Sequence, residues 1–374
     1  MKKSFSETEK ESPDEIEGIP DPKDGLIANA ALKLITLLLG ILVAVVLGVL
    51  LRSLSRVFLP FGFAFFFSYL LYPIQQRLIA FRIPKAISIA LVLLLVFGVL
   101  NAAGQIIYAS IAAFTREIPR YEQRLEEIGM ETLEKMEIPL EDVKRQIQEF
   151  DWTALFGGRS MTQTITRTIS SSMGTFFGFL GQSILVLVLT IFILGGREQT
   201  SLKISKALPP QSAKRVNSIL ESIQREVQTY LITKTLMSLA TGISVTLLLW
   251  IMKVDFPLIW GLLSFVLNFI PSIGSILASL FPITVCLIQY GPSPRLAFLI
   301  VILVLLHGFI GYILEPKLLG RSMRLSPLLV LLSLIFWAYV WGIPGMILAV
   351  PFTSAIKIAF ENVDGLKPIA IMMG

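Results

Sequence analysis

Two long stretches of this chain contain no charged residue, yet proline and glycine interrupt each of them near its middle. They run from Phe256 to Tyr290, 35 residues, and from Leu325 to Ile356, 32 residues. Two crossings of a bilayer need about 20 helical residues each plus a turn, more than either stretch comfortably offers. Proline and glycine predict helix breaks at 270–275 and 341–345. Each stretch is therefore expected to fold back into two arms of about 15 residues.

The two breaks also share a sequence pattern, because Gly-x-Ile-Leu-Ala occurs at 274–278 and again at 345–349. Free backbone groups cannot face lipid, so such tips must be buried in protein or line a wet cavity. We expect two copies of one re-entrant hairpin, and the surrounding charges give the copies opposite orientations, as in transporters with inverted repeats. The alternative is a pair of ordinary kinked hairpins, because proline and glycine are common in membrane helices.

Composition sets the fold class. Hydrophobic residues make up 54% of the 374 positions and charged residues 16%, whereas soluble domains hold about 25% charged residues. The prediction is an all-α polytopic membrane protein with about six full transmembrane helices, two inverted re-entrant helical hairpins and an extramembrane amphipathic helical insert. The full spans are expected at 31–51, 58–72, 86–114, 175–194, 235–252 and 296–314.

Charge divides the remaining segments. The insert at 115–170 is net acidic and has apolar residues at helical spacing, whereas 195–234 is basic and should be cytoplasmic. Arg52 and Arg56 conflict with this orientation of the first hairpin of spans. The expected segments are a disordered acidic tail with a cytoplasmic N-terminus (1–29), three spans (30–114), the extracytoplasmic insert (115–170), a fourth span (171–194), the basic segment (195–234), a span with the first hairpin (235–290), a span with the second (295–360) and a C-terminal tail (361–374).

Three blocks of sequence carry a family resemblance: "IPSIGSILASLFP", "LEPKLLGRSMRLSPLLVLLSL" and "GIPGMILAVPFTSAIK". They resemble the autoinducer-2 exporter (AI-2E) family of bacterial membrane proteins. The likeness extends over most of residues 30–360 and is specific in the last hundred of them. The matching residues are Pro271, Gly274, Pro316, Lys317, Gly320, Leu325, Pro327, Gly342, Gly345, Ala349 and Pro351.

The resemblance implies a multipass transporter of the bacterial cytoplasmic (inner) membrane and a homo-oligomer, with a pentamer as one candidate. Its members export a small furanone-type signal, and some act as sodium/proton antiporters. We expect a secondary exporter of a small polar solute working by alternating access; a cation/proton antiporter and a non-transporting membrane scaffold are the alternatives. The chain has no Walker loop, G-x-S-x-G or HExxH motif, which argues against an enzyme.

A small polar solute needs a few hydrogen-bonding groups in an apolar cavity. The candidates for substrate binding and gating are Asn268, Pro271, Ser272, Gly274, Ser275, Gly342, Pro344, Gly345, Thr353 and Ser354, with bonding of the serines to their own helix as the alternative. The candidates for ion coupling are Asp255, His307, Glu315 and Lys317, with packing or headgroup contacts as the alternative. One histidine and one cysteine, Cys286, give no expected metal site or cofactor. The expected partners are the solute and membrane lipid, and the net acidic insert argues against nucleic acid.

Overall fold

The computed structural model describes residues 35, 38–40, 42, 43, 45–135, 161–319, 325–363 and 365–374, and within these ranges it is helical, with no strand. The expected tail at 1–29 and the centre of the insert, 136–160, lie outside the described residues. The chain divides into two units, Met1–Leu54 and Ser55–Gly374. In the first unit the described residues include an apolar helix, Leu38–Ser53.

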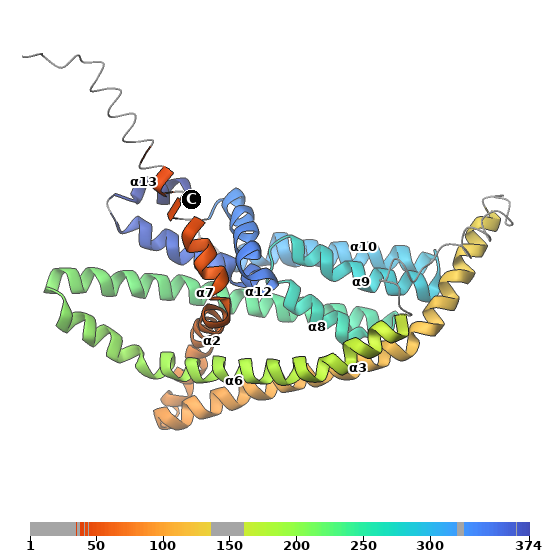
Figure 1. Cartoon of the computed structure of the whole chain (residues 1–374), viewed down its shortest axis with the longest axis horizontal. Coiled ribbons are helices and arrows are strands. Elements are labelled where there is room, and N and C mark those ends of the chain that lie inside the picture. The colour runs from red at the N-terminus through yellow and green to blue at the C-terminus, as the bar shows by residue number, and fades with distance from the viewer. Residues whose placement is uncertain are drawn as a thin grey trace, which may run out of the picture. The chain divides into compact units, whose positions relative to one another are not determined.

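Four long helices open the second unit: α2 (Ser55–Ala80), α3 (Lys85–Lys135), α6 (Met161–Ala207) and α7 (Pro210–Ile251) (Figure 1). Both α3 and α6 run without a break through the expected borders of the insert, at 114 and 170. The described ends of the insert are therefore extensions of long helices. The turn between α6 and α7 contains Pro209 and Pro210, and Pro210 begins α7, where a missing N–H costs nothing.

The first charge-free stretch folds back on itself as α8 (Pro257–Leu267) and α9 (Ile273–Tyr290). The rings of Trp260 and Phe281 stack with centroids 5.7 Å apart, although 21 positions separate them. The arms have 11 and 18 residues, in place of two arms of about 15, and α9 alone is long and apolar enough to span a membrane. The break lies where proline and glycine predict it. That the hairpin is re-entrant stays a prediction.

The second charge-free stretch, 325–356, forms most of α12 (Pro327–Glu361), which is broken at Gly342, where φ is 67° and ψ is −147°. In one straight helix, residues 337 and 353 would lie about 24 Å apart. Instead Trp337 Nε1 is 3.4 Å from Thr353 Oγ1, and the rings of Trp337 and Phe352 have centroids 5.1 Å apart. The chain therefore folds back here too, and the two arms of α12 meet at this break (Figure 1).

The remaining helices are α10 (Pro294–Gly308), the π-helix η1 (Phe309–Leu314), α11 (Glu315–Leu319) and α13 (Lys367–Met372). Pro316 lies two residues after the end of η1, and a proline cannot donate the backbone hydrogen bond that a regular α-helix requires at that position. A π-helical stretch is a rare distortion that is frequent at functional sites. Glu315 follows η1 directly and begins α11.

The described residues contain six helices that are long and apolar enough to cross a membrane, or seven if the bent pair Gly181–Gly196 and Gln199–Ala207 is one span. The number of these helices agrees with the predicted number of spans, but the helices are not all the predicted ones. Both α9 and α12 qualify, although they belong to the expected hairpins, and the first expected span is only partly described. The six are Ser55–Ala80, Lys85–Ile106, Pro210–Ile251, Ile273–Tyr290, Pro294–Leu318 and Pro327–Glu361.

Candidate functional site: the hairpin tips

The tip of the first hairpin is a tight, strained turn. The N–H of Ile273 donates to the carbonyl of Pro271 at 2.7 Å, across Ser272, whose φ and ψ are 61° and −47°. This three-residue γ-turn with positive φ is rare and unfavourable for a residue with a side chain. Ser272 is exposed and Pro271 half-buried, and Ser275 donates back to the Ser272 carbonyl at 3.1 Å. The Ser275 hydroxyl therefore bonds within its own turn.

Both tips need a glycine in the same structural role. A Cβ on Gly274 would overlap the backbone carbonyl of Leu267, seven residues earlier, and a Cβ on Gly345 would overlap the carbonyl of Trp337, eight residues earlier. Each glycine is buried and lies where the returning arm passes the outgoing one. The sequence pattern predicted these two glycines as equivalents, and they share this close approach of two backbones.

The tip of the second hairpin places its candidates differently. Gly342 is exposed and Pro344 half-buried, whereas Thr353 and Ser354 on the returning arm are buried. The hydroxyl of Thr353 accepts a long hydrogen bond from the indole N–H of Trp337. The two hydroxyl-bearing residues therefore face the protein interior rather than the surface.

The two hairpins meet on one turn of α2. A Cβ on Gly62 would lie 2.9 Å from the Phe352 ring and 3.0 Å from Leu348, both on the returning arm of α12. One turn further along α2, the ring of Phe66 packs against that of Phe269 in the first tip, with centroids 5.8 Å apart. Residues more than 75 positions apart in the sequence thus converge on a single helix turn.

A buried polar face of α7 lies against the first tip. Lys234, Ser238 and Thr241 follow one another at helical spacing and are at most 3% exposed. Asn268, the residue that ends α8, donates through Nδ2 to the hydroxyl of Ser238 at 3.0 Å. This hydroxyl keeps its own proton to donate. The amide and hydroxyl together offer the donors and acceptors that a small polar solute requires.

One turn before Ser238 the same face carries a buried ion pair. Lys234 Nζ lies 2.7 and 2.9 Å from the two carboxylate oxygens of Glu315, with side chains 3% and 15% exposed. Sequence reasoning singled out Glu315 but missed Lys234, which it assigned to a basic cytoplasmic segment. The available signal was the spacing of Lys234, Ser238 and Thr241 on one face of α7. Lys317 is exposed and does not join this pair.

His307 lies between α10 and α9. Its Nδ1 is 2.9 Å from the carbonyl of Leu303 and 3.3 Å from the hydroxyl of Ser279. Its Nε2 is buried without a hydrogen-bond partner among the described residues. Within the same described ranges, no three or more His, Cys, Asp and Glu residues form a group that could hold a metal ion. The ring contacts two helices rather than either tip.

Asp255 lies at the base of the first hairpin, about 16 Å of helix from its tip. Its carboxylate accepts from Tyr121 at 2.8 Å and from Gln289 at 3.1 Å, so it ties α3 and the end of α9 to the start of α8. Burial, followed by the hydrogen bond to Asp255 and the charge of its carboxylate, raises the pKa of Tyr121 well above its usual value. This is a structural junction outside the apolar part of α3.

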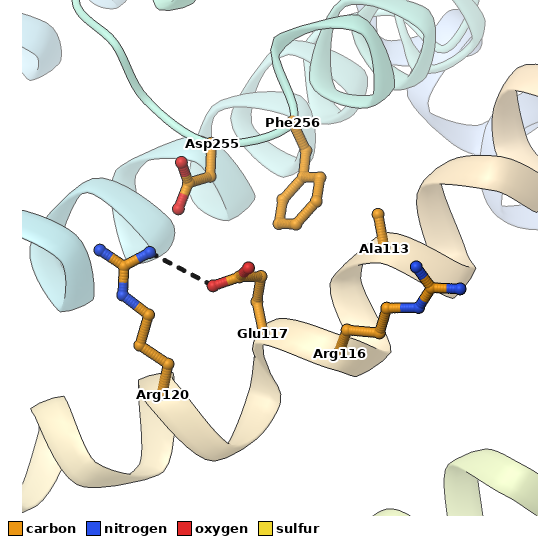
Figure 2. A pocket seen from close by; sticks show the side chains of 6 residues that line it. All are labelled: Ala113, Arg116, Glu117, Arg120, Asp255 and Phe256. Carbon is orange, nitrogen blue, oxygen red and sulfur yellow. Dashed lines mark hydrogen bonds and ion pairs between the residues drawn. The ribbon is translucent and has the colours of Figure 1, made fainter.

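Beside this junction lies a hollow of about 300 Å³. Figure 2 shows Glu117 and Arg120 on α3 below the Asp255–Phe256 segment. Arg120 Nη1 lies 3.3 Å from Glu117 Oε2. Arg116 and Arg120 are exposed, so the hollow is polar and open to its surroundings. It is separate from the tips, and we assign the candidate site to the tips. The lining residues are Ala113, Arg116, Glu117, Arg120, Asp255 and Phe256.

Comparison with known proteins shows the family to which the chain belongs. The model of the AI-2E family transporters matches residues 35–365. The AI-2 transport protein TqsA of Escherichia coli K12 is 30% identical over 343 residues, covering 91% of this chain and 95% of that protein. A putative transport protein of Borreliella burgdorferi is 29% identical over 321 residues, covering 86% of this chain and 85% of that protein. The chain is a multipass membrane protein that belongs to the AI-2E family of transporters.

Proposed function

We propose that this protein is a secondary transporter that exports a small polar solute by alternating access, with the two hairpins as its gates. The observation that carries the proposal is the meeting of both hairpins on one turn of α2. Broken helices that meet inside a membrane protein expose backbone groups able to bind a solute. Asn268 and Ser238 supply side-chain groups at the same place.

The solute that we propose is autoinducer-2 or a related small polar signal. The support is the similarity to TqsA, whose name describes it as an AI-2 transport protein. The site chemistry agrees with an uncharged, hydroxyl-rich molecule, because an amide and a hydroxyl can each donate and accept hydrogen bonds. The only charged groups that the described contacts place near Asn268 are Lys234 and Glu315, and these neutralise each other.

Everted membrane vesicles provide the test, because export from the cell becomes uptake into such vesicles. Vesicles from cells that lack their own family members, with and without this protein, are incubated with autoinducer-2, and the solute inside is measured over time. We expect uptake with the protein and a loss of at least about tenfold in an Asn268→Leu variant. Asn101→Leu is the matched control, because Asn101 bonds only to Gln105 among the described hydrogen bonds, on α3.

Uptake no faster than in empty vesicles would contradict autoinducer-2 as the solute. Equal losses in the Asn268→Leu and Asn101→Leu variants would remove the tip from the transport site. A sodium or proton flux without solute uptake would point to antiport instead. We also propose that the protein lies in the bacterial inner membrane and forms a homo-oligomer. Its presence in inner-membrane vesicles would test the location, and cross-linking in the same vesicles would test the homo-oligomer.

A further inference from the structure

We propose that the Lys234–Glu315 ion pair is a charge-operated gate, which closes the tip site from the aqueous face where the α10 span ends. The inference rests on the proposed transport function and adds to it two positioning residues and the element that moves. The pair joins α7 to α11 only one helical turn from Ser238, the residue that binds the tip amide of Asn268.

The two partners differ in how firmly the structure holds them. Lys234 belongs to a continuous helix of 42 residues and is 3% exposed. Glu315 lies near the end of the helical span Pro294–Leu318, directly after the six residues of the π-helix η1, and is 15% exposed. Glu315 is therefore the partner that can move, and η1 is the distorted element whose return to α-helical geometry would move it.

The residues around the ion pair favour two arrangements, one closed with the pair formed and one open with Glu315 withdrawn from Lys234. A buried ammonium without its carboxylate is costly, so the closed pair resists thermal opening. One turn before Lys234, the hydroxyl of Tyr230 is buried and has no hydrogen-bond partner among the described residues, and neither does the hydroxyl of Thr235. Unpaired polar atoms of this kind usually mark water or a second conformation. The Tyr230 hydroxyl, which the charge of Glu315 reaches, provides a hydrogen-bonding group for the ammonium when Glu315 has left it.

A cysteine reporter tests the gate without knowledge of the solute. In a Cys286→Ala background, which removes the single cysteine of the chain, Ser238→Cys places a thiol one turn behind the pair. A membrane-impermeant thiol reagent is applied to everted and to right-side-out vesicles, and the labelling rate is measured. We expect slow labelling with the pair intact and an increase of at least about tenfold in Glu315→Gln. The increase should occur in everted vesicles alone, because the basic loop that follows this span is expected to be cytoplasmic.

Charge reversal separates gating from packing. Lys234→Glu combined with Glu315→Lys restores the ion pair, so labelling should return to within about threefold of the background rate. Glu361→Gln is the matched control, because it neutralises the partner of another buried lysine, Lys357, at 3.8 Å. That pair lies at the far end of α12, and its loss should leave the labelling rate unchanged.

Three results would overturn the gate: no faster labelling in a Glu315→Gln protein that remains folded, equal acceleration from both faces, or no recovery in the charge-reversed variant. A Glu315→Gln protein too unstable to purify would leave Lys234→Met, which breaks the same pair and must accelerate labelling likewise. The proposed function and the gate can fail separately. If the unmodified protein takes up no solute but the labelling rate of Ser238→Cys still depends on the ion pair, the proposed function is contradicted and the gate is not.

Discussion

The two hairpins share the backbone of their tips but are held together by different means. Gly274 and Gly345 both lie against a backbone carbonyl of the opposite arm. The arms of the first hairpin are joined at their base by polar contacts, in which the Gln289 amide binds Asp255 and the carbonyl of Lys253. Those of the second are joined near the tip by aromatic rings around Trp337.

This difference shows which part of a repeated unit the fold itself constrains. Glycine is required where two backbones approach each other, because any side chain there would overlap a carbonyl oxygen. The means of holding the arms together can change, since polar contacts and ring packing both join two helices. The copies should therefore respond alike to changes at the glycines and differently to changes elsewhere.

The largest expected effect tests the shared feature. Gly274→Ala and Gly345→Ala each place a Cβ on a backbone carbonyl oxygen, so each should lower the free energy of unfolding by about 3 kcal/mol or more. Thermal unfolding of the purified protein in detergent is the measurement. Gly308→Ala is the control, because no atom lies within 4 Å of its added Cβ. If all three variants melt alike, the close approach at the tips is wrong.

The next effect separates the two hairpins. Trp337→Ala removes a buried ring that contacts three other rings and should destabilise the protein by about 3–5 kcal/mol. Trp250→Ala is matched in chemistry, but that ring is 68% exposed, so its loss should cost little. Proteolysis of the second hairpin should increase in Trp337→Ala alone. Equal stability of both variants would contradict an aromatic anchor.

A smaller effect concerns the strain at each turn. Gly342→Ala meets no close atom, but its φ of +67° and ψ of −147° suit glycine alone and should cost about 1–3 kcal/mol. Ser272→Gly relieves a positive φ and should change stability by less than about 1 kcal/mol, towards greater stability. Both values come from thermal unfolding. A clear loss of stability in Ser272→Gly would mean that the strained turn is misplaced.

The smallest effect lies at the base of the first hairpin. Tyr121→Phe removes one hydrogen bond to Asp255 and should cost about 1 kcal/mol. The raised pKa of Tyr121 in the folded protein means that its stabilisation is complete below the ordinary pKa of tyrosine, about 10, and declines as pH rises above it. Unfolding at pH 8 and pH 10.5 should show a steeper loss in the unmodified protein than in the variant; parallel losses would contradict this.

The sequence predicted the helical class and both helix breaks, because proline and glycine act locally on the backbone. It did not predict that Lys234 pairs with Glu315, since the contact joins positions 81 apart and depends on how α7 packs. Nor did it predict the π-helix, which changes hydrogen-bond register without changing hydrophobic periodicity. The unequal arms of the first hairpin followed from a five-residue turn, 268–272, which composition alone does not indicate.

The turn of α2 between Gly62 and Phe66 has a mechanical consequence. Gly62 touches one hairpin and Phe66 touches the other, and the two residues lie one turn apart on the same face of α2. Tilting α2 about a point between them would therefore press on one hairpin while withdrawing from the other. Because both contacts are tightly packed, the two hairpins cannot both move away from α2 at the same time. In a transporter, a helix that contacts both hairpins in this way would keep them from opening together, and so would prevent a continuous leak across the membrane.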